Sequence, residues 1–197
     1  MLLTRGVPGT HDIQLMINLF RKVKKNTFRS ISIPKFDKSI DDRCKKNSWF
    51  KLKKKPDILI LEGWCVGARA EGSRSLNRPI NVLEKNADKK KIWRSYVNNQ
   101  LKSKYSKLFD QLDSLLYLKA KNFKLLKRWR LKQEKKLKMK SGTKKNSKIM
   151  NEKEVETFMM TYQRITQNMF KNAPKYSSAV IDLNENHQIK KVKFKNA

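Results

Sequence analysis

The sequence feature that most constrains the fold is an uninterrupted aliphatic run, Ile-Leu-Ile-Leu, at residues 58–61. A run of this kind is typical of a strand that is buried on both faces, as in a parallel sheet. Glu62 follows directly and is therefore predicted at the carboxyl end of that strand. In open α/β sheets, ligands bind in the crevice beyond the carboxyl ends of the strands. Glu62 is thus a candidate to hold Mg²⁺ or a bound water.

The remaining apolar patterns alternate between strands and helices. Short apolar segments predict strands over residues 31–33, 114–118 and 179–183, and helical spacing predicts helices over 13–23, 88–109, 122–140 and 152–170. This order and the length of 197 residues indicate a single α/β domain, with a parallel sheet flanked by helices. Within it, residues 119–150 form a basic region and residues 184–197 a lysine-rich tail.

The chain is strongly basic, with 48 Lys and Arg against 17 Asp and Glu, a net charge of +31. Anionic partners are therefore expected. Lysines occur in almost every segment, however, and diffuse lysine is more often a solvated surface than a dedicated nucleic-acid site. The charge allows nucleic-acid binding without favouring it.

Several classes of protein are excluded by residue types that the chain lacks. Its two cysteines, Cys44 and Cys65, and its two histidines have no zinc-ligand spacing, and they indicate neither a disulfide framework nor a structural metal. Its longest aliphatic run is far shorter than the roughly 20 residues of a membrane span, and the first residues lack a secretory signal. We expect a soluble, cytoplasmic protein without a membrane partner.

The first candidate site is the turn at residues 5–12, which precedes a predicted helix. Thr10 or Asp12 can cap that helix, and the N–H groups at a helix amino terminus favour an anion. The same turn brings Arg5 and His11 close to them, where an anionic hydroxylated substrate could be bound and deprotonated. Caps and turns are far commoner than sites, so Asp12 is first of all a cap.

Two further groups of charged residues are candidates. Lys35, Asp37 and Arg43 lie in a charged loop that is either a solvated turn or a cluster around a phosphate or metal, and spacing does not decide between them. Arg128 and Arg130 lie in the basic helix that follows the predicted strand 114–118. From that helix they could swing over bound phosphates.

Three stretches, taken together, resemble a known family. They read Leu-Thr-Arg-Gly-Val-Pro-Gly-Thr-His-Asp at 3–12, Pro-Lys-Phe-Asp-Lys-Ser at 34–39 with Asp-Arg at 42–43, and Ile-Leu-Glu-Gly-Trp-Cys-Val-Gly at 60–67. In this order and spacing they are similar to the ATP-dependent D-glycerate kinases, a family of P-loop kinases related to uridine kinase and phosphoribulokinase. Trp129-Arg130 and the helix residues Phe158, Tyr162 and Arg164 extend the resemblance to about residue 183.

The resemblance implies transfer of the γ-phosphoryl group of ATP to D-glycerate, with Mg²⁺ between the phosphates. The family favours the 3-hydroxyl as acceptor, a choice that the residues alone do not make. By motif position, the resemblance places the acceptor pocket at Arg5, Thr10, His11 and Asp12, with Lys35, Asp37 and Arg43 beside it. It places the acidic residue at the end of the strand at Glu62. The arginines that would clamp the transferred phosphate are Arg130 and Arg128. The general base stays open between Asp12 and Asp37.

One family element is missing from the sequence. None of the six glycines belongs to a GxxxxGK[ST] loop, whose N–H groups cradle phosphates, so the resemblance implies a P-loop-kinase-like sheet without its amino-terminal strand, Walker A loop and first helix. The true start lies upstream, or a separate chain supplies the loop, or activity has been lost. The isolated chain is expected to be inactive, with strand edges left open to pair with another chain. The alternative function is a non-catalytic basic protein that binds nucleic acid or another polyanion on a kinase scaffold.

Overall fold

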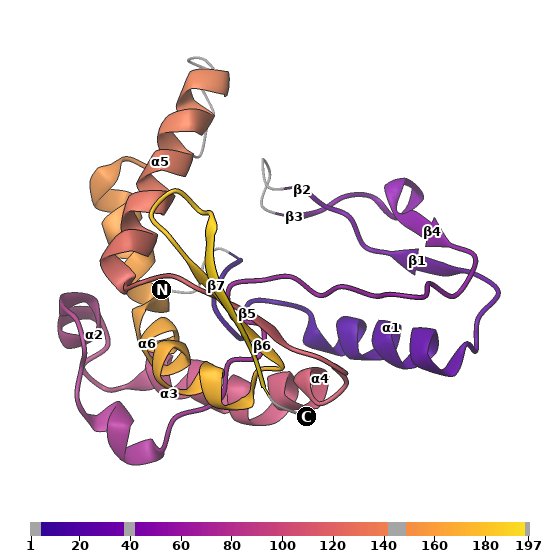
Figure 1. The fold of residues 1–197 in the computed structure, drawn as a ribbon, viewed down its shortest axis with the longest axis horizontal. Helices are drawn as coiled ribbons and strands as arrows, with labels where there is room; N and C mark the ends of the chain where they lie inside the picture. The colour runs from indigo at the N-terminus through magenta and orange to yellow at the C-terminus, as the bar shows by residue number, and fades with distance from the viewer. Residues whose placement is uncertain (1–4, 38–41, 142–148, 196–197) are drawn as a thin grey trace.

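The computed structural model describes residues 5–37, 42–141 and 149–195 (Figure 1). Its largest sheet has three strands in the order β5 (Leu116–Lys119), β6 (Ala179–Leu183) and β7 (Ile189–Phe194). β5 and β6 are parallel, with Leu116 opposite Ala179, whereas β6 and β7 are antiparallel with a register shift at Asp182 and Leu183. The sheet is therefore mixed, and the fold is α/β as predicted.

The helices pack on this sheet and on one another. The longest is α6 (Glu152–Tyr176), which begins with a capping box between Asn151 and Glu154 and buries one apolar stripe. α3 (Ile92–Gln100), a π-helical turn (Leu101–Tyr105) and α4 (Ser106–Phe109) form one nearly continuous helix, and α1 (Ile13–Lys25) packs against its end. α2 (Val82–Ala87) and α5 (Phe123–Ser141) complete the set of α-helices in the described ranges.

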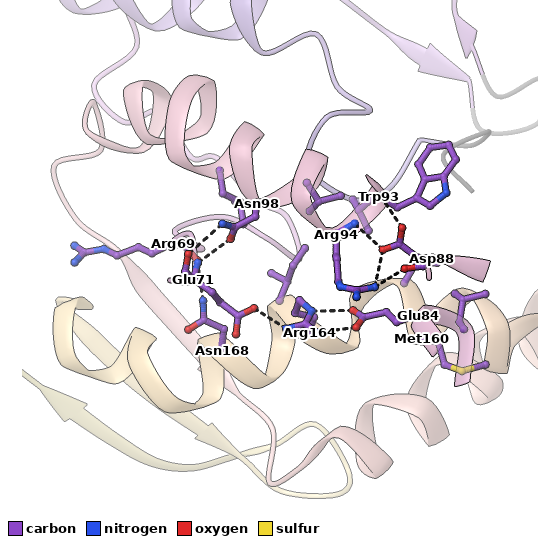
Figure 2. A pocket seen from close by; sticks show the side chains of 16 residues that line it. Arg69, Glu71, Glu84, Asp88, Trp93, Arg94, Asn98, Met160, Arg164 and Asn168 are labelled. Atoms are coloured by element: carbon purple, nitrogen blue, oxygen red, sulfur yellow. Dashed lines mark hydrogen bonds and ion pairs between the residues drawn. The ribbon is translucent and has the colours of Figure 1, made fainter. Parts of the chain in front are cut away.

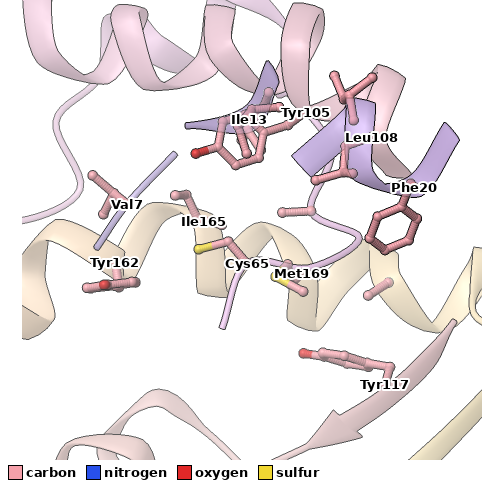
Figure 3. Packing of buried hydrophobic residues seen from close by; sticks show 14 of the residues in the cluster. Val7, Ile13, Phe20, Cys65, Tyr105, Leu108, Tyr117, Tyr162, Ile165 and Met169 are labelled. Atoms are coloured by element: carbon pink, nitrogen blue, oxygen red, sulfur yellow. The ribbon is translucent and has the colours of Figure 1, made fainter. Parts of the chain in front are cut away.

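The hydrophobic core lies between α1, the helix that ends with α4, and α6. Figure 3 shows Ile13 and Phe20 of α1, Leu108 of α4 and Met169 of α6 converging on it. Tyr117 reaches the core from β5. Each helix contributes residues at helical spacing, which is why the sequence pattern predicted these helices correctly.

Two small antiparallel ladders follow α1 and lie apart from the three-stranded sheet (Figure 1). β1 (Ile31–Ile33) pairs with β4 (Phe50–Leu52), and β2 (Phe36–Asp37) pairs with β3 (Asp42–Arg43). The predicted strand at 31–33 is thus present, ending at Pro34 as expected. It belongs to a hairpin and not to the main sheet.

The prediction of a buried strand at residues 58–61 was wrong. This segment is extended but has no strand partner among the described residues, and the side chains of Ile58 and Ile60 are 77% and 83% exposed. A strand needs a neighbour to take its backbone hydrogen bonds, and the described part of the chain places none beside this run. The strand predicted at 114–118 is present as β5, but only Tyr117 is buried, while Leu116 and Leu118 are 62% and 61% exposed.

The basic regions are more ordered than their composition suggested. Six residues of the lysine-rich tail form β7, and Asp182 of β6 lies 3.8 Å from the Nζ atom of Lys193 and 4.0 Å from that of Lys119. Most of the basic region is helix α5, and residues 142–148 of that region lie outside the described residues. No helix of the described ranges has the length and apolar character needed to cross a membrane.

The packing of Leu108 provides a test of the core. Its side chain is 2% exposed, so truncation in Leu108→Ala removes buried methyl groups and leaves a cavity. We expect the free energy of unfolding to fall by about 2–5 kcal/mol, measured by urea denaturation. The matched control is Ile92→Ala at a 61% exposed position, where the change should be within about 0.5 kcal/mol. Equal losses in the two variants would contradict this account of the core.

Candidate active site

The turn before α1 is fixed by hydrogen bonds from its own residues. The Thr10 hydroxyl accepts the Gly6 N–H (2.7 Å) and donates to the Val7 carbonyl (2.8 Å), so it closes the turn. Asp12 caps α1 by accepting the Leu15 N–H at 3.1 Å. Gly9 has a φ of 102°, and a Cβ there would lie 2.4 Å from the Tyr96 ring, so only glycine fits. Of the two predicted caps, Asp12 is the one that caps the helix.

His11 is held by a tyrosine that is distant in the sequence. The Tyr105 hydroxyl accepts the Gly9 N–H at 3.0 Å and lies 2.7 Å from Nδ1 of His11. The hydroxyl oxygen has a second lone pair beside the one that takes the Gly9 N–H, so the Tyr105 hydroxyl can bond to Nδ1 as donor or as acceptor, and in either case it holds the ring in place. Burial raises the pKa of Tyr105 to about 12, so this hydroxyl stays protonated at neutral pH.

The charge state of His11 follows from its surroundings. Burial lowers the pKa of His11 below its ordinary value, and the nearby Arg5 guanidinium lowers it further. The imidazole is therefore neutral at physiological pH, with one nitrogen as donor and the other as acceptor.

The β2–β3 hairpin brings further charged residues to the turn. Arg43 lies 3.3 Å from the second carboxylate oxygen of Asp12, and the Arg5 guanidinium stacks 4.4 Å from the centre of the Phe36 ring. Asp37 lies opposite Asp42 in the same hairpin. The structure thus gathers Arg5, His11, Asp12 and Arg43, which are separated by up to 38 positions in the sequence.

The side chain of Lys35 is exposed, and this residue joins the hairpin through its carbonyl oxygen, which accepts the Cys44 N–H at 2.8 Å. Glu62 is also exposed and lines a large groove, and none of the interactions found among the described residues connects it to the turn. The described residues contain no group of three His, Cys, Asp or Glu side chains that could hold a metal ion. Glu62 is therefore not part of such a group of three ligands among the described residues.

An aromatic row on α6 connects the turn to the basic helix α5. Tyr162 packs beneath Gly6, and its ring centre lies 5.0 Å from those of Trp64 and Phe158. The Arg130 guanidinium of α5 lies over the Phe158 ring at 5.2 Å. Arg130 is ion-paired with Glu134, and its Nε is buried without a hydrogen-bond partner in the described part of the chain.

Arg130 also lines a pocket of about 350 Å³ whose other lining residues include two lysines, Gln133 and three aromatic side chains. Trp129 and His187 stack on one wall, with ring centres 4.1 Å apart at an angle of 29°. Lys132 and Lys136 lie along the same helix face. Arg128 does not line this pocket, because it pairs with Glu185 at 2.7 Å on the exposed surface and thereby lowers the pKa of that carboxyl group.

A second, smaller cavity of about 50 Å³ is the centre of a buried ion-pair network (Figure 2). Arg164 of α6 donates to both oxygens of Glu84 at 2.8 and 2.6 Å and to Glu71 at 3.1 Å. Arg94 pairs with Asp88 at 3.0 Å. These bonds fasten the segment between residues 71 and 94 to α6, so this cavity has a structural role.

Sequence reasoning missed Tyr105, Trp64 and the partners of Arg164. Tyr105 is 94 positions from His11, and no local spacing relates the two. Trp64 and Tyr162 were part of the family resemblance without a role of their own. The acidic residues Glu71 and Glu84 carried no signal, since charged residues in a loop are normally solvated.

The chain is similar in sequence to known kinases. No protein-family model matches the chain. A kinase of Schizosaccharomyces pombe, mug58, is 33% identical over 164 residues, which are 80% of this chain and 56% of that protein. The chloroplastic D-glycerate 3-kinase of Arabidopsis thaliana is 22% identical over 139 residues, 66% of this chain and 27% of that enzyme. The chain thus spans little more than half the length of the yeast relative, and less of the plant one.

A solved structure shows the fold. The D-glycerate 3-kinase of Cryptococcus neoformans superposes with a TM-score of 0.75 and 23% identity, covering 97% of this chain and 69% of that one. The chain therefore has the P-loop-kinase-like α/β fold that the resemblance implied, and its sequence relatives are kinases.

The buried network makes Arg164 a sensitive position. In Arg164→Leu, Glu84 and Glu71 would keep their negative charges without the partner that compensates them. Loss of one member of a buried ion pair costs about 3–5 kcal/mol, and we expect a loss of this size in urea denaturation. Arg74→Leu, at an exposed arginine of the same segment, is the control and should change stability little. A small loss in both variants would show that the network contributes nothing.

His11 gives a pH dependence of known sign. Its pKa in the folded chain is lower than the ordinary 6.5, so the unfolded chain binds the proton first and stability falls as pH drops below 6.5 toward the folded value. His11→Gln removes this contribution. The stability difference between the wild type and His11→Gln, measured by thermal denaturation between about pH 8 and pH 5, should be flat at high pH and should shrink toward low pH. A difference that is constant across this range would refute the lowered pKa.

Proposed function

We propose that this chain contains the acceptor-binding part of an ATP-dependent kinase, and that the acceptor is D-glycerate, phosphorylated on its 3-hydroxyl. The observation that carries the proposal is the cluster of Arg5, His11, Asp12 and Arg43 around the amino terminus of α1. The plant relative and the fungal structural neighbour, both D-glycerate 3-kinases, support it. The yeast relative supports the broader assignment as a kinase.

The cluster suits a small hydroxy acid. A carboxylate takes charge-assisted hydrogen bonds from guanidinium groups, and two are near the turn: Arg43 beside Asp12, and Arg5 on the ring of Phe36, which pairs with Arg43 in the hairpin. The neutral His11 adds a ring nitrogen that can bond to a substrate oxygen. Asp12 uses one oxygen as the cap and turns the other to Arg43, so displacement of Arg43 by substrate would release this oxygen to accept a hydroxyl proton. Asp37 is the second candidate for the general base.

The pocket beside Arg130 suits the nucleotide. Stacked aromatic rings at Trp129 and His187 can hold a base, and Arg130, Lys132 and Lys136 can bind phosphates. Phosphoryl transfer depends mainly on positioning and neutralisation of charge, and Mg²⁺ bound to ATP supplies part of the latter. Mg²⁺ on phosphates needs only one or two carboxylates, so Glu62 fits the role of a single ligand. A phosphate loop has to come from polypeptide outside this sequence.

Binding of D-glycerate tests the acceptor site directly in the 197-residue chain. A ligand that binds only the folded state raises the melting temperature, and D-glycerate should do so in a saturable way while L-glycerate does so much less. Arg43→Ala removes one charge-assisted contact and should weaken the binding measured by calorimetry by about tenfold or more. His11→Gln should weaken it as well.

The control is Lys45→Ala, an exposed cation just beyond Arg43. This variant should bind D-glycerate as the wild type does. If the two enantiomers bind alike, or if Lys45→Ala weakens binding as much as Arg43→Ala, the pocket is not a stereospecific glycerate site. Binding of RNA with a steep salt dependence, in the absence of any response to D-glycerate, would favour the polyanion-binding alternative.

A further inference from the structure

The strand β7, drawn in yellow in Figure 1, has one edge without a strand beside it. It is the last strand in the order β5, β6, β7, and in the described residues no strand pairs with its outer side. All of its residues are exposed, and β6 is the element against which it packs. The free N–H and C=O groups of such an edge are a template on which another extended chain can form backbone hydrogen bonds.

The hydrogen bond of Lys195 shows which backbone groups of this edge are free. Its N–H donates to the Ser178 carbonyl at 2.9 Å, so the backbone of Lys195 faces β6. The direction of the backbone groups alternates along an antiparallel strand, so Lys193 also faces β6. The N–H and C=O groups of Val192 and Phe194 therefore point away from the sheet, toward solvent.

The side chains of this edge differ between its two faces. Successive side chains of a strand point to opposite faces, so Val192 and Phe194 share one face and Lys191, Lys193 and Lys195 share the other. Val192 is 39% exposed and Phe194 is 76% exposed. The outer edge of β7 thus offers an apolar strip on one face and a cationic strip on the other.

Most of the charge on the cationic strip is uncompensated. Residues 188–197 contain four lysines and neither Asp nor Glu. The Nζ atom of Lys193 lies 3.8 Å from Asp182 of β6, whereas no ion pair engages Lys191 or Lys195 in the described part of the chain. Asp182 shows that a carboxylate on an adjacent strand can reach a lysine of β7. A carboxylate on a strand at the outer edge would have the same relation to these lysines.

The same lysines disfavour a second copy of this chain as the occupant. Backbone groups that point outward can bond only to groups of the other strand that point toward them. In an antiparallel pair of two β7 strands, positions 191, 193 and 195 therefore lie opposite positions 191, 193 and 195 of the other copy, so lysine faces lysine in every register. Like charges directly opposite one another are destabilising, and edge lysines prevent self-association in this way.

We propose that the outer edge of β7 binds an extended acidic segment of a partner protein, in which Asp or Glu residues alternate with apolar residues. The backbone of this segment bonds to the N–H and C=O groups of Val192 and Phe194. Its acidic side chains lie beside the cationic strip, and its apolar side chains lie beside the apolar strip. The proposal is independent of the proposed function, because no residue of β7 belongs to the turn before α1 or lines the pocket beside Arg130.

The test uses the 197-residue chain and the capped peptide Glu-Val-Glu-Val-Glu-Val-Glu at about 0.15 M salt, where long-range attraction is screened. We expect saturable binding and slower amide hydrogen exchange at Val192 and Phe194. The N–H of Lys193 already faces β6, so its exchange should be slow with and without the peptide. Protection at alternate residues is the sign of a strand paired with this edge.

Methylated peptides separate backbone pairing from charge attraction. A methyl group on the nitrogens of the valines removes the N–H groups that would bond to β7, and it leaves the charge unchanged. This peptide should bind more weakly by about tenfold or more. The matched control carries the methyl groups on the glutamate nitrogens, which point away from β7 in the proposed register, and it should bind as the unmodified peptide does.

Variants locate the binding to β7. Lys195→Glu reverses one charge of the cationic strip and should weaken binding about fivefold. Lys89→Glu makes the same change at an exposed position between α2 and α3 and should bind as the wild type does. Val192→Pro removes an outward N–H, and an edge strand accepts proline where its N–H faces solvent. This variant should keep the circular dichroism spectrum of the wild type and should lose peptide binding.

Four results would overturn the proposal. Equal binding of the two methylated peptides would reduce the effect to charge attraction. Peptide binding without protection of Val192 and Phe194 would place it elsewhere. Protection of these two amides in the free chain that grows with protein concentration would assign the edge to a second copy. Tighter binding of single-stranded RNA of equal charge, lost in Lys195→Glu, would make the lysines a polyanion site. None of these results depends on D-glycerate.

Discussion

The apolar and aromatic face of α6 is the surface on which the other elements are positioned. Its buried residues Val155, Met159, Tyr162, Ile165, Met169 and Ala173 recur at helical spacing and form one stripe. Segments that are far apart in the sequence attach to this helix. The turn at Gly6 packs on Tyr162, Arg130 lies over Phe158, and the segment around Glu84 is bound by Arg164. A displacement of α6 would therefore move the candidate acceptor pocket and the pocket beside Arg130 together.

The spacing of the two pockets follows from the same helix. Phe158 and Tyr162 are four residues apart, about one turn, and so they lie on one face about 6 Å from each other along the axis. Phe158 supports Arg130, and Tyr162 supports the turn that carries His11 and Asp12. Because aromatic rings are stiff and the row is packed, the two sites are held in a fixed relation without any direct contact between their charged groups.

Local sequence patterns predicted the helices whose packing partners are present in the described part of the chain. Periodic apolar residues located α1 and α6, and the Asp12 cap followed from the residue type at the start of α1. The strand β7 was missed because its sequence, Ile-Lys-Lys-Val-Lys-Phe, alternates imperfectly and is half lysine. The aliphatic run at 58–61 has the composition of a doubly buried strand, yet Ile58 and Ile60 are exposed. The prediction of a buried strand there was wrong because a strand depends on neighbouring strands, and the described residues do not provide them.

The site itself was predictable only as a set of residue types. Arg5, Thr10, His11 and Asp12 are close enough in the sequence to be grouped by a turn, whereas the hydroxyl that holds the His11 ring comes from Tyr105, in the π-helical turn that follows α3. A pairing over 94 positions has no sequence period, so only the folded chain reveals it. The same holds for Arg43, which reaches Asp12 because of the β2–β3 hairpin.

The net charge of +31 cannot by itself give the site its selectivity. Diffuse positive charge attracts small acids, nucleotides and nucleic acids alike, and at physiological salt its field is screened beyond about 8 Å. Discrimination has to come from groups within hydrogen-bond reach of the ligand. At the turn these groups are two guanidinium ions, one carboxylate and a histidine that is kept neutral by burial and by Arg5. A neutral imidazole held in place by Tyr105 can bond to one oxygen by direction, whereas a third cation would add attraction without direction. The contact between Tyr105 and His11 is therefore the feature of the candidate site that can add direction to general basicity.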